Sequence, residues 1–313
     1  MKKPRNLPPF ERWSWRQHVK NALLYCAMRA GIAAAQRLPI RGLLRLLGCL
    51  APYLFRREAR RARAQISTVL PHVDAVKTTR RMFVHFAESI WELCRMHQSV
   101  PTLDAAARRV LDEVLAEKKG VVLITGHIGN WEILGQAIAV AGYPITYIAR
   151  RAYDPRLTAL LHQWRTSRGL EILWRNRNSG RAILRVLEKN RLMAFLIDQD
   201  TPTAGTYVPF FGRPAFTPTT PAALALRTGA PVIFCWHHRR GKQHKITIER
   251  IHYAPTGNTE SDVLALTTIL SARLESVIRA APEQWVWMHK RWTTISQEFA
   301  LGIETLPVRS ASN

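Results

Sequence analysis

Residues 120–132 constrain the fold more than any other part of the sequence. They read Gly-Val-Val-Leu-Ile-Thr-Gly-His-Ile-Gly-Asn-Trp-Glu. The apolar, largely β-branched residues 121–124 are typical of a buried strand. Gly126 and Gly129 interrupt this pattern, and an apolar helical periodicity from about residue 131 to 141 predicts a helix. The segment therefore predicts a strand, a sharp turn and a helix in close succession.

Two side chains with catalytic potential flank this turn. His127 stands at the end of the predicted strand and Glu132 in the first turn of the predicted helix. Because the chain must bend sharply between them, we predict that the two come within hydrogen-bond distance. A neutral imidazole, with a usual pKa of about 6.5, can take a proton from a hydroxyl near neutral pH. A carboxylate on its other nitrogen fixes the tautomer and stabilises the imidazolium.

Such a pair favours acyl transfer to an alcohol, with the hydroxyl of the substrate as the nucleophile. The glycines would let the backbone approach the substrate, and the start of the helix supplies free N–H groups for developing negative charge. The alternative is that His127 is an ordinary loop residue and that Glu132 is a first-turn acid stabilised by the helix dipole.

Strand and helix patterns alternate from residue 121 onward. Strands are predicted at 121–125, 145–149, 171–174, 192–197, 231–236 and 245–251, and helices near 131–141, 155–168, 179–189, 218–228 and 260–280. This alternation predicts an α/β fold with a central, mostly buried sheet and helices on both faces. The stretch 201–218, which contains proline, glycine and aromatic residues, is typical of a long loop.

The N-terminal third has a different character. Helical patterns run from about residue 20 to 117 and are interrupted near Pro39, Pro52, Pro71 and Pro101. We therefore divide the chain into a flexible N-terminus (1–18), a helical membrane-associating region (19–117) and an α/β core (118–313).

Residues 22–55 are rich in leucine and alanine, but Arg29, Arg37, Arg41 and Arg45 interrupt them. A membrane-spanning helix needs about 20 predominantly apolar residues, and a central arginine costs about 2.5 to 3.5 kcal/mol on insertion scales. This pattern favours helices that lie on a membrane surface, with arginines reaching lipid phosphates. The alternative is a soluble helical layer packed on the core.

The net charge restricts the possible partners. The chain has 46 Lys and Arg against 22 Asp and Glu, a formal net charge of +24, which favours binding to nucleic acid, an anionic bilayer or a phosphorylated glycolipid. No helix-turn-helix, zinc finger or aromatic-basic strand motif points to nucleic acid. The four cysteines, Cys26, Cys49, Cys94 and Cys235, form no C-x-x-C pair, so we expect buried free thiols and no metal site.

Several motifs in the same order resemble the lipid A late acyltransferase family, whose members are lysophospholipid-acyltransferase-like enzymes with a His-x4-acid motif. The matching blocks are 126–132, 147–150 with Asp154 and Pro155, Arg165 and Gly169, 197–200, 208–215, 226–231 and 282–292. Together they cover about residues 20 to 295.

The resemblance implies roles for individual residues. His127 would be the general base, Glu132 its partner, and Arg150 a ligand of the thioester oxyanion or of an acceptor phosphate. Asp198 and Asp200 match an acidic block of the family. Further substrate-binding candidates are Gly129, Asn130, Phe210 and Phe211. The two phenylalanines would either line an acyl-chain groove or anchor the loop 201–218 to the core.

The implied function is transfer of a fatty acyl chain from a thioester, acyl carrier protein or acyl-CoA, to a hydroxyl of a lipid A precursor or related glycolipid. Because the thioester is already activated, we expect no cofactor beyond this co-substrate. Other acceptors, a lysophospholipid or a mannosylated phosphoinositide, are alternatives, and a basic nucleic-acid-binding protein is an alternative of another class. The expected location is the cytoplasmic face of the inner membrane, as a peripheral or monotopic protein.

Overall fold

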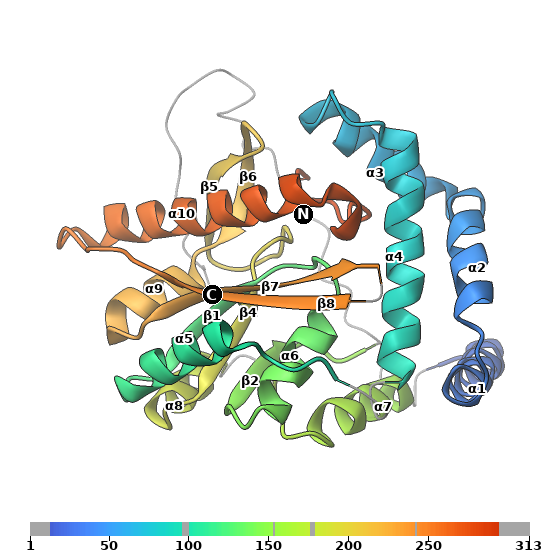
Figure 1. The fold of residues 1–313 in the computed structure, drawn as a ribbon, viewed down its shortest axis with the longest axis horizontal. Helices are drawn as coiled ribbons and strands as arrows, with labels where there is room; N and C mark the ends of the chain where they lie inside the picture. Colours follow the sequence, from blue (N-terminus) through green and yellow to red (C-terminus); the bar gives the residue numbers. More distant parts are fainter. Residues whose placement is uncertain (1–12, 96–99, 153, 176–178, 242, 294–313) are drawn as a thin grey trace.

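The protein is described here by a computed structural model that covers residues 13–95, 100–152, 154–175, 179–241 and 243–293 (Figure 1). The greater part of the segment predicted to be flexible, 1–18, lies outside the described residues. Helix α1 nevertheless begins inside that segment, at Trp15, because the Ser14 hydroxyl accepts a hydrogen bond from the Gln17 backbone N–H.

A six-stranded sheet forms the centre of the molecule, as predicted. Its strands are β1 (Val121–Thr125), β2 (Ile145–Ala149), β3 (Glu171–Trp174), β4 (Leu192–Leu196), β7 (Val232–Arg240) and β8 (Gln243–Ile251). The order is β3-β2-β4-β1-β7-β8, parallel except for the antiparallel β7–β8 pair. Strand β1 lies between β4 and β7, and every one of its residues is buried. A strand covered on both faces requires the continuous apolar run that the sequence shows.

Helices cover both faces of the sheet. Val122 and Ile124 of β1 pack in one apolar cluster with α9 (Thr220–Thr228) and α10 (Thr259–Ala280). Val121 and Leu123 pack in a second cluster with α5 (Ala105–Ala116) and α6 (Trp131–Val140). The split follows from the alternation of side chains along a strand. In Figure 1, α10 lies on one side of the sheet and α5 and α6 on the other. Helices α7 (Pro155–Thr166) and α8 (Ser179–Glu188) connect β2, β3 and β4.

In the described part of the chain, five helices precede the sheet. They are α1 (Trp15–Arg37), α2 (Arg41–Leu54), α3 (Arg56–Val69), α4 (Ala75–Arg95) and α5. Helix α4 stands across one end of the sheet, and α2 packs along its outer side (Figure 1). The break predicted near Pro52 is confirmed: Pro52 itself lies inside α2, the helix ends at Leu54, and α3 begins at Arg56. Helix α5, although it precedes residue 118, buries Leu111 and Val114 in the sheet core.

The long loop predicted at 201–218 is also wrong, because most of it forms a β-hairpin. Strands β5 (Gly205–Phe210) and β6 (Arg213–Pro218) pair antiparallel as a separate two-stranded sheet. Phe211 and Gly212 form the turn, with φ of 55° and 70°, as a two-residue turn with left-handed backbone at both positions requires.

Two further expectations concern the burial of the cysteines and whether an N-terminal helix spans a membrane. All four thiols are free, and Cys94 and Cys235 are buried as predicted, but Cys26 is exposed on α1 and Cys49 is half-buried. Among the helices in the described ranges, none combines the length and the apolar character needed to cross a bilayer.

Candidate active site

The site begins at the carboxyl end of β1, where the backbone turns toward α6. Gly129 has a φ of 59°, a conformation that other residues rarely adopt. A Cβ at this position would lie 2.0 Å from the backbone oxygen of His237. The Gly129 N–H donates to the Gln284 carbonyl at 2.8 Å. The glycine therefore lets the turn approach strand β7, and the role predicted for Gly129 in substrate binding stays a prediction.

Asp198 is the carboxylate that holds His127. The Nδ1 atom of His127 lies 2.7 Å from Oδ1 of Asp198, and the His127 backbone N–H donates to Oδ2 at 2.6 Å. The indole N–H of Trp285 donates to the same Oδ2 at 2.8 Å. Strands β1 and β4 are parallel neighbours, with Thr125 opposite Leu196. The residues that follow them therefore meet at one edge of the sheet.

The electrostatics of this pair suit a charged carboxylate. Asp198 is fully buried, and burial by itself raises the pKa of a carboxyl group. The charge of His127 and the hydrogen bonds from His127 and Trp285 outweigh burial and hold the pKa of Asp198 well below its usual range. An ionised Asp198 accepts the Nδ1 hydrogen, which leaves the Nε2 lone pair of His127 free to accept a proton.

Glu132 does not pair with His127, and this part of the sequence prediction is wrong. Its carboxylate accepts a hydrogen bond from Nε of Arg165 at 3.0 Å, and Nη2 of Arg165 contacts its other oxygen. Glu132 lies in the first turn of α6 on the side that packs toward α7, where Gln136, one turn later, donates to the Arg165 carbonyl. The orientation of the helix thus directs the carboxylate to α7 and away from the imidazole.

The Nε2 side of His127 faces polar and aromatic side chains. The Nε2 atom of Gln199 lies 3.4 Å from Nε2 of His127 and 3.1 Å from Nε2 of His289. The rings of Trp131 and His289 each lie 4.8 Å from the His127 ring, centroid to centroid. Burial and the nearby His127 lower the pKa of His289 to about 4, so this ring is neutral at pH 7. The His127 side chain is 17% exposed, so a substrate hydroxyl can reach it.

Asn130 holds the turn in place and does not face a substrate. It is buried, and its side-chain oxygen accepts from the Ile133 N–H at the start of α6. Its amide nitrogen donates to Glu92 of α4 at 2.9 Å, and its backbone N–H donates to Nδ1 of His237 at 2.9 Å. The prediction that Asn130 binds substrate is therefore corrected to a positioning role.

Of the remaining candidates, none joins His127. Arg150 is exposed just after β2, and in the described part of the chain no hydrogen bond or ion pair links it to His127, Glu132 or Asp198. Asp200 accepts from the Thr293 hydroxyl at 2.9 Å. Phe210 and Phe211 are buried in the main apolar cluster, so they anchor the hairpin to the core and do not line an open groove.

Four residues have roles that the sequence patterns did not indicate: Arg165, Gln199, Trp285 and His289. A C-terminal segment carries two of them and is fixed by α3. The side-chain amide of Gln65 donates to the carbonyls of Trp287 and His289 at 2.6 and 2.9 Å, and Arg61 donates to the Met288 carbonyl at 3.0 Å. One signal could have indicated Gln199. Asp198 and Gln199 come just after β4, and β4 lies next to β1 in the sheet, so residues that follow the two strands are close in space.

Across the ranges that the structure describes, no group of three or more His, Cys, Asp or Glu side chains could hold a metal ion.

Comparisons with known proteins agree with the motif order. A family model described as "Bacterial lipid A biosynthesis acyltransferase" matches residues 13–294. The chain is 30% identical over 187 residues to a protein named phosphatidylinositol mannoside acyltransferase from Mycobacterium tuberculosis (strain CDC 1551 / Oshkosh), covering 58% of this chain and 57% of that protein. A protein of the same name from Mycolicibacterium smegmatis (strain ATCC 700084 / mc(2)155) is 28% identical over 179 residues, covering 56% and 57%. The matches thus span a little over half of the relatives' length.

Proposed function

The chain belongs to the bacterial lipid A biosynthesis acyltransferase family, and we propose that it transfers a fatty acyl group from a thioester to a hydroxyl of a membrane glycolipid. The observation that carries this proposal is the His127–Asp198 pair, in which Asp198 holds Nδ1 while the ring stays partly exposed with its Nε2 beside the Gln199 amide. Acyl transfer to an alcohol needs a base for the hydroxyl proton, and the thioester supplies an activated acyl carbon.

The proposed reaction proceeds in two stages. The Nε2 atom of His127 takes the proton of the acceptor hydroxyl while the oxygen forms a bond to the thioester carbonyl carbon. Asp198 stabilises the resulting imidazolium through its hydrogen bond to Nδ1. The tetrahedral intermediate then releases the thiolate by breaking the carbon–sulfur bond, and the imidazolium returns the proton to sulfur. The products are an ester and a free thiol.

The start of α6 is our proposed site for the developing oxyanion. Trp131, the first residue of α6, packs against the His127 ring, and the N-terminus of a helix stabilises negative charge. Glu132 would oppose that charge if it were unpaired. Its ion pair with Arg165 neutralises it, so we place Arg165, and not Arg150, among the residues that shape the electrostatics of the reaction.

The similar proteins indicate the chemical class of lipid that could serve as the acceptor. They are named for a phosphatidylinositol mannoside, whereas the family is named for lipid A biosynthesis. Both are glycolipids that carry sugar hydroxyls and phosphate. We propose this shared chemistry for the acceptor of the present chain, with acyl carrier protein or acyl-CoA as donor.

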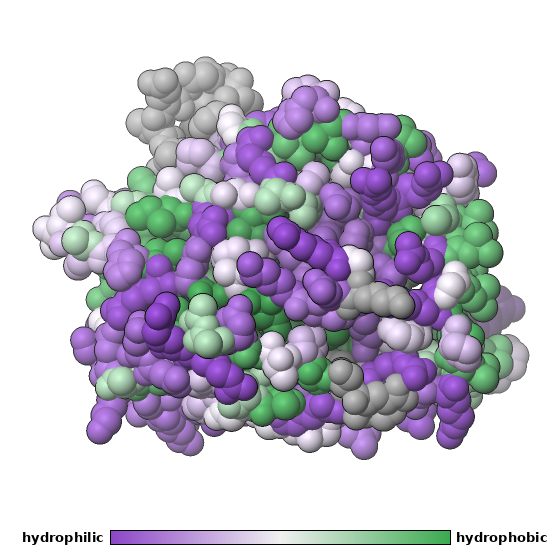
Figure 2. Space-filling view, in the orientation of Figure 1, coloured by the Kyte–Doolittle hydropathy of each residue, from purple (hydrophilic) through white to green (hydrophobic). Residues whose placement is uncertain are grey.

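We further propose that α1 and α2 rest on the membrane that contains this acceptor. Leu43, Leu46, Leu47, Leu50 and Leu54 of α2 are between 47% and 75% exposed. Figure 2 shows hydrophobic surface along the edge of the molecule where α2 lies in Figure 1. Exposed apolar area of this kind marks an interaction surface, and a helix with one apolar and one basic face suits a lipid interface. The proposed location is the cytoplasmic face of the inner membrane.

A direct assay tests the reaction. Purified protein is incubated with palmitoyl-acyl carrier protein or palmitoyl-CoA and either a lipid A precursor or a phosphatidylinositol mannoside in mixed micelles, and the products are identified by mass spectrometry. We expect one acceptor to gain a palmitoyl group. His127→Ala should lower the rate by about 10²- to 10⁴-fold, the usual contribution of a general base.

The matched control is His72→Ala, because His72 is exposed and lies outside the site. It should keep the wild-type rate. A folded His127→Ala protein with wild-type turnover would refute the mechanism, and the absence of product with both acceptors and both donors would refute the proposed function.

A further inference from the structure

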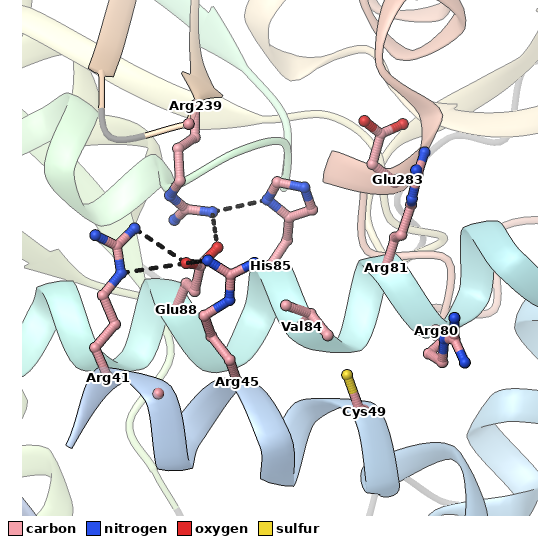
Figure 3. A pocket seen from close by; sticks show the side chains of 12 residues that line it. Arg41, Arg45, Cys49, Arg80, Arg81, Val84, His85, Glu88, Arg239 and Glu283 are labelled. Carbon is pink, nitrogen blue, oxygen red and sulfur yellow. Dashed lines mark hydrogen bonds and ion pairs between the residues drawn. The ribbon is translucent and has the colours of Figure 1, made fainter.

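A cavity lies between α2, α4 and the β7–β8 hairpin, and its lining includes none of the side chains described around His127. Its volume is about 690 Å³, which is within the range of small-molecule binding pockets. Figure 3 shows its walls: α2 and α4 run side by side below it, and Arg239 of β7 enters from above. Its position next to α2 places it beside the exposed leucines of that helix.

The cavity is strongly cationic. Five of its twelve lining residues are arginines, Arg41, Arg45, Arg80, Arg81 and Arg239, and only two, Glu88 and Glu283, are acidic. Arg41 is paired, since it donates to Oε1 of Glu88 at 3.2 and 3.0 Å. Arg239 is paired as well, because it donates to the carboxylate of Glu92 at 2.7 and 2.6 Å.

The remaining three arginines have donors left for a ligand, although Arg45 also forms an ion pair with the Glu88 carboxylate. Arg45 lies 3.6 Å from Glu88 and its side chain is 58% exposed. Arg80 and Arg81 are exposed, and neither forms an ion pair with a carboxylate of the described residues. Because these guanidinium groups come from two helices, they present donors from more than one direction, which suits an oxyanion with several acceptor oxygens.

His85 adds a neutral donor. Its Nδ1 atom lies 2.8 Å from Nη1 of Arg239, which has only hydrogens to offer, so Nδ1 is the acceptor. The imidazole hydrogen is therefore on Nε2, and in Figure 3 this nitrogen faces the side of the cavity that holds Arg81 and Glu283. Burial and the charge of Arg239 lower the pKa of His85, so the ring donates without adding charge at pH 7.

We propose that this cavity binds the phosphate group of a membrane lipid. The excess arginines supply the charge, and His85 supplies an oriented donor. Helix α2 connects the cavity to the apolar surface, because Arg41 and Arg45 line the cavity while Leu46 and Leu47 of the same helix are 56% and 47% exposed. A headgroup in the cavity can therefore extend its acyl chains along α2. The assignment concerns a site separate from His127 and does not depend on the proposed reaction.

Calorimetry with two soluble probes tests the proposal without a membrane surface. The first probe is dihexanoyl phosphatidic acid below its micelle concentration, and the second is sn-glycerol 3-phosphate, which has the phosphate but no acyl chains. The cavity variant is Arg45→Gln with Arg81→Gln. The control is Arg29→Gln with Arg57→Gln, which removes the same charge from exposed positions on α1 and α3. His127→Ala is measured alongside, since it should bind both probes as wild type does.

We expect saturable binding of the lipid probe, weaker binding of glycerol phosphate, and a loss of at least about tenfold in lipid affinity for the cavity variant, as expected for two lost charge-assisted contacts. The control should bind as wild type does. Equal affinity for the two probes would overturn a lipid in favour of a free phosphate ester. Equal behaviour of the cavity variant and the control, or no saturable binding of either probe, would overturn the site itself.

Discussion

Strand β1 and helix α2 are both rich in aliphatic side chains, but they lie at opposite extremes of exposure. Val121, Val122, Leu123 and Ile124 are each 0% exposed, whereas Leu43 and Leu46 of α2 are 53% and 56% exposed. The strand has no charged residue to keep in water and is covered on both faces. The helix carries Arg41 and Arg45 on the face toward α4, so its leucines point outward. Apolar content alone therefore does not determine whether a segment is buried. The positions of its charged residues decide which of its apolar side chains remain exposed.

If β1 and its neighbour β4 serve chemistry while α2 serves attachment, changes in one region should leave the other function intact. The largest effect should come from Asp198→Asn. The amide can no longer stabilise the imidazolium and can hold the wrong tautomer, so kcat should fall by about 10²- to 10⁴-fold. Steady-state kinetics would measure the loss, and flotation with anionic liposomes should show unchanged binding.

Glu132→Gln provides the control for Asp198→Asn, because Glu132 pairs with Arg165 and not with His127. Its kcat should fall less than that of Asp198→Asn. A larger fall for Glu132→Gln would restore Glu132 as the partner of the base during turnover.

A smaller effect is expected for Leu46→Asp on α2. The substitution places a charge in the surface that we propose to enter the lipid interface, and the lost burial of a half-exposed leucine should lower liposome affinity by about tenfold. Val140→Asp is the control, because Val140 of α6 is similarly exposed, 53% against 56%. Both variants should keep the wild-type rate on micellar substrate. Equal liposome affinity for the two variants would exclude the exposed face of α2 as the attachment surface.

A prediction of another kind, on stability and not on activity or binding, concerns the pH dependence at the catalytic edge. The pKa of His289 is about 4 in the folded protein against about 6.5 in an unfolded chain, so the unfolded chain takes up the proton first as the pH falls. The contribution of His289 to stability is therefore complete above about pH 6.5 and is lost toward pH 4, by at most about 1.4 kcal/mol per pH unit. Asp198 acts with the same sign but at lower pH, because its pKa is depressed from a lower usual value.

Urea unfolding at pH 7 and pH 5 measures this effect. His289→Gln should lose less stability between the two pH values than the wild type does. His72→Gln, at an exposed position, should follow the wild type. An identical pH dependence for all three proteins would show that His289 titrates normally in the folded state.

The alternation of strands and helices was predictable because, outside the β5–β6 hairpin, the strands are short apolar runs and the helices between them have a helical apolar period. Five of the six predicted strands begin within one residue of those observed, and β8 begins two residues earlier than predicted. The β5–β6 hairpin was not predictable in the same way, because Pro209, Pro214 and Pro218 argue against a strand. Prolines are tolerated there because the two-stranded sheet has an edge on both sides, so a missing N–H breaks no interior ladder.

The site was predictable in part. His127 follows from the end of a buried strand, but sequence proximity selected the wrong carboxylate. Glu132 is five residues away and faces α7, while Asp198 is 71 residues away and lies beside His127 because β1 and β4 are neighbours. Strand order is set by the packing of the whole sheet, and no local pattern encodes it.

The strand order β3-β2-β4-β1-β7-β8 also means that the site forms late in folding, because its residues are far apart in the sequence. His127 and Asp198 are 71 residues apart, and Asp198 and Trp285 are 87 apart. Contacts of such sequence separation form slowly, because long stretches of chain must be brought together first. During synthesis, α1 and α2 leave the ribosome before any residue of the catalytic group, and the Trp285 bond to Asp198 forms only when almost all of the described chain has emerged. The leucines of α2 can therefore meet a lipid surface while the protein is still without a catalytic centre.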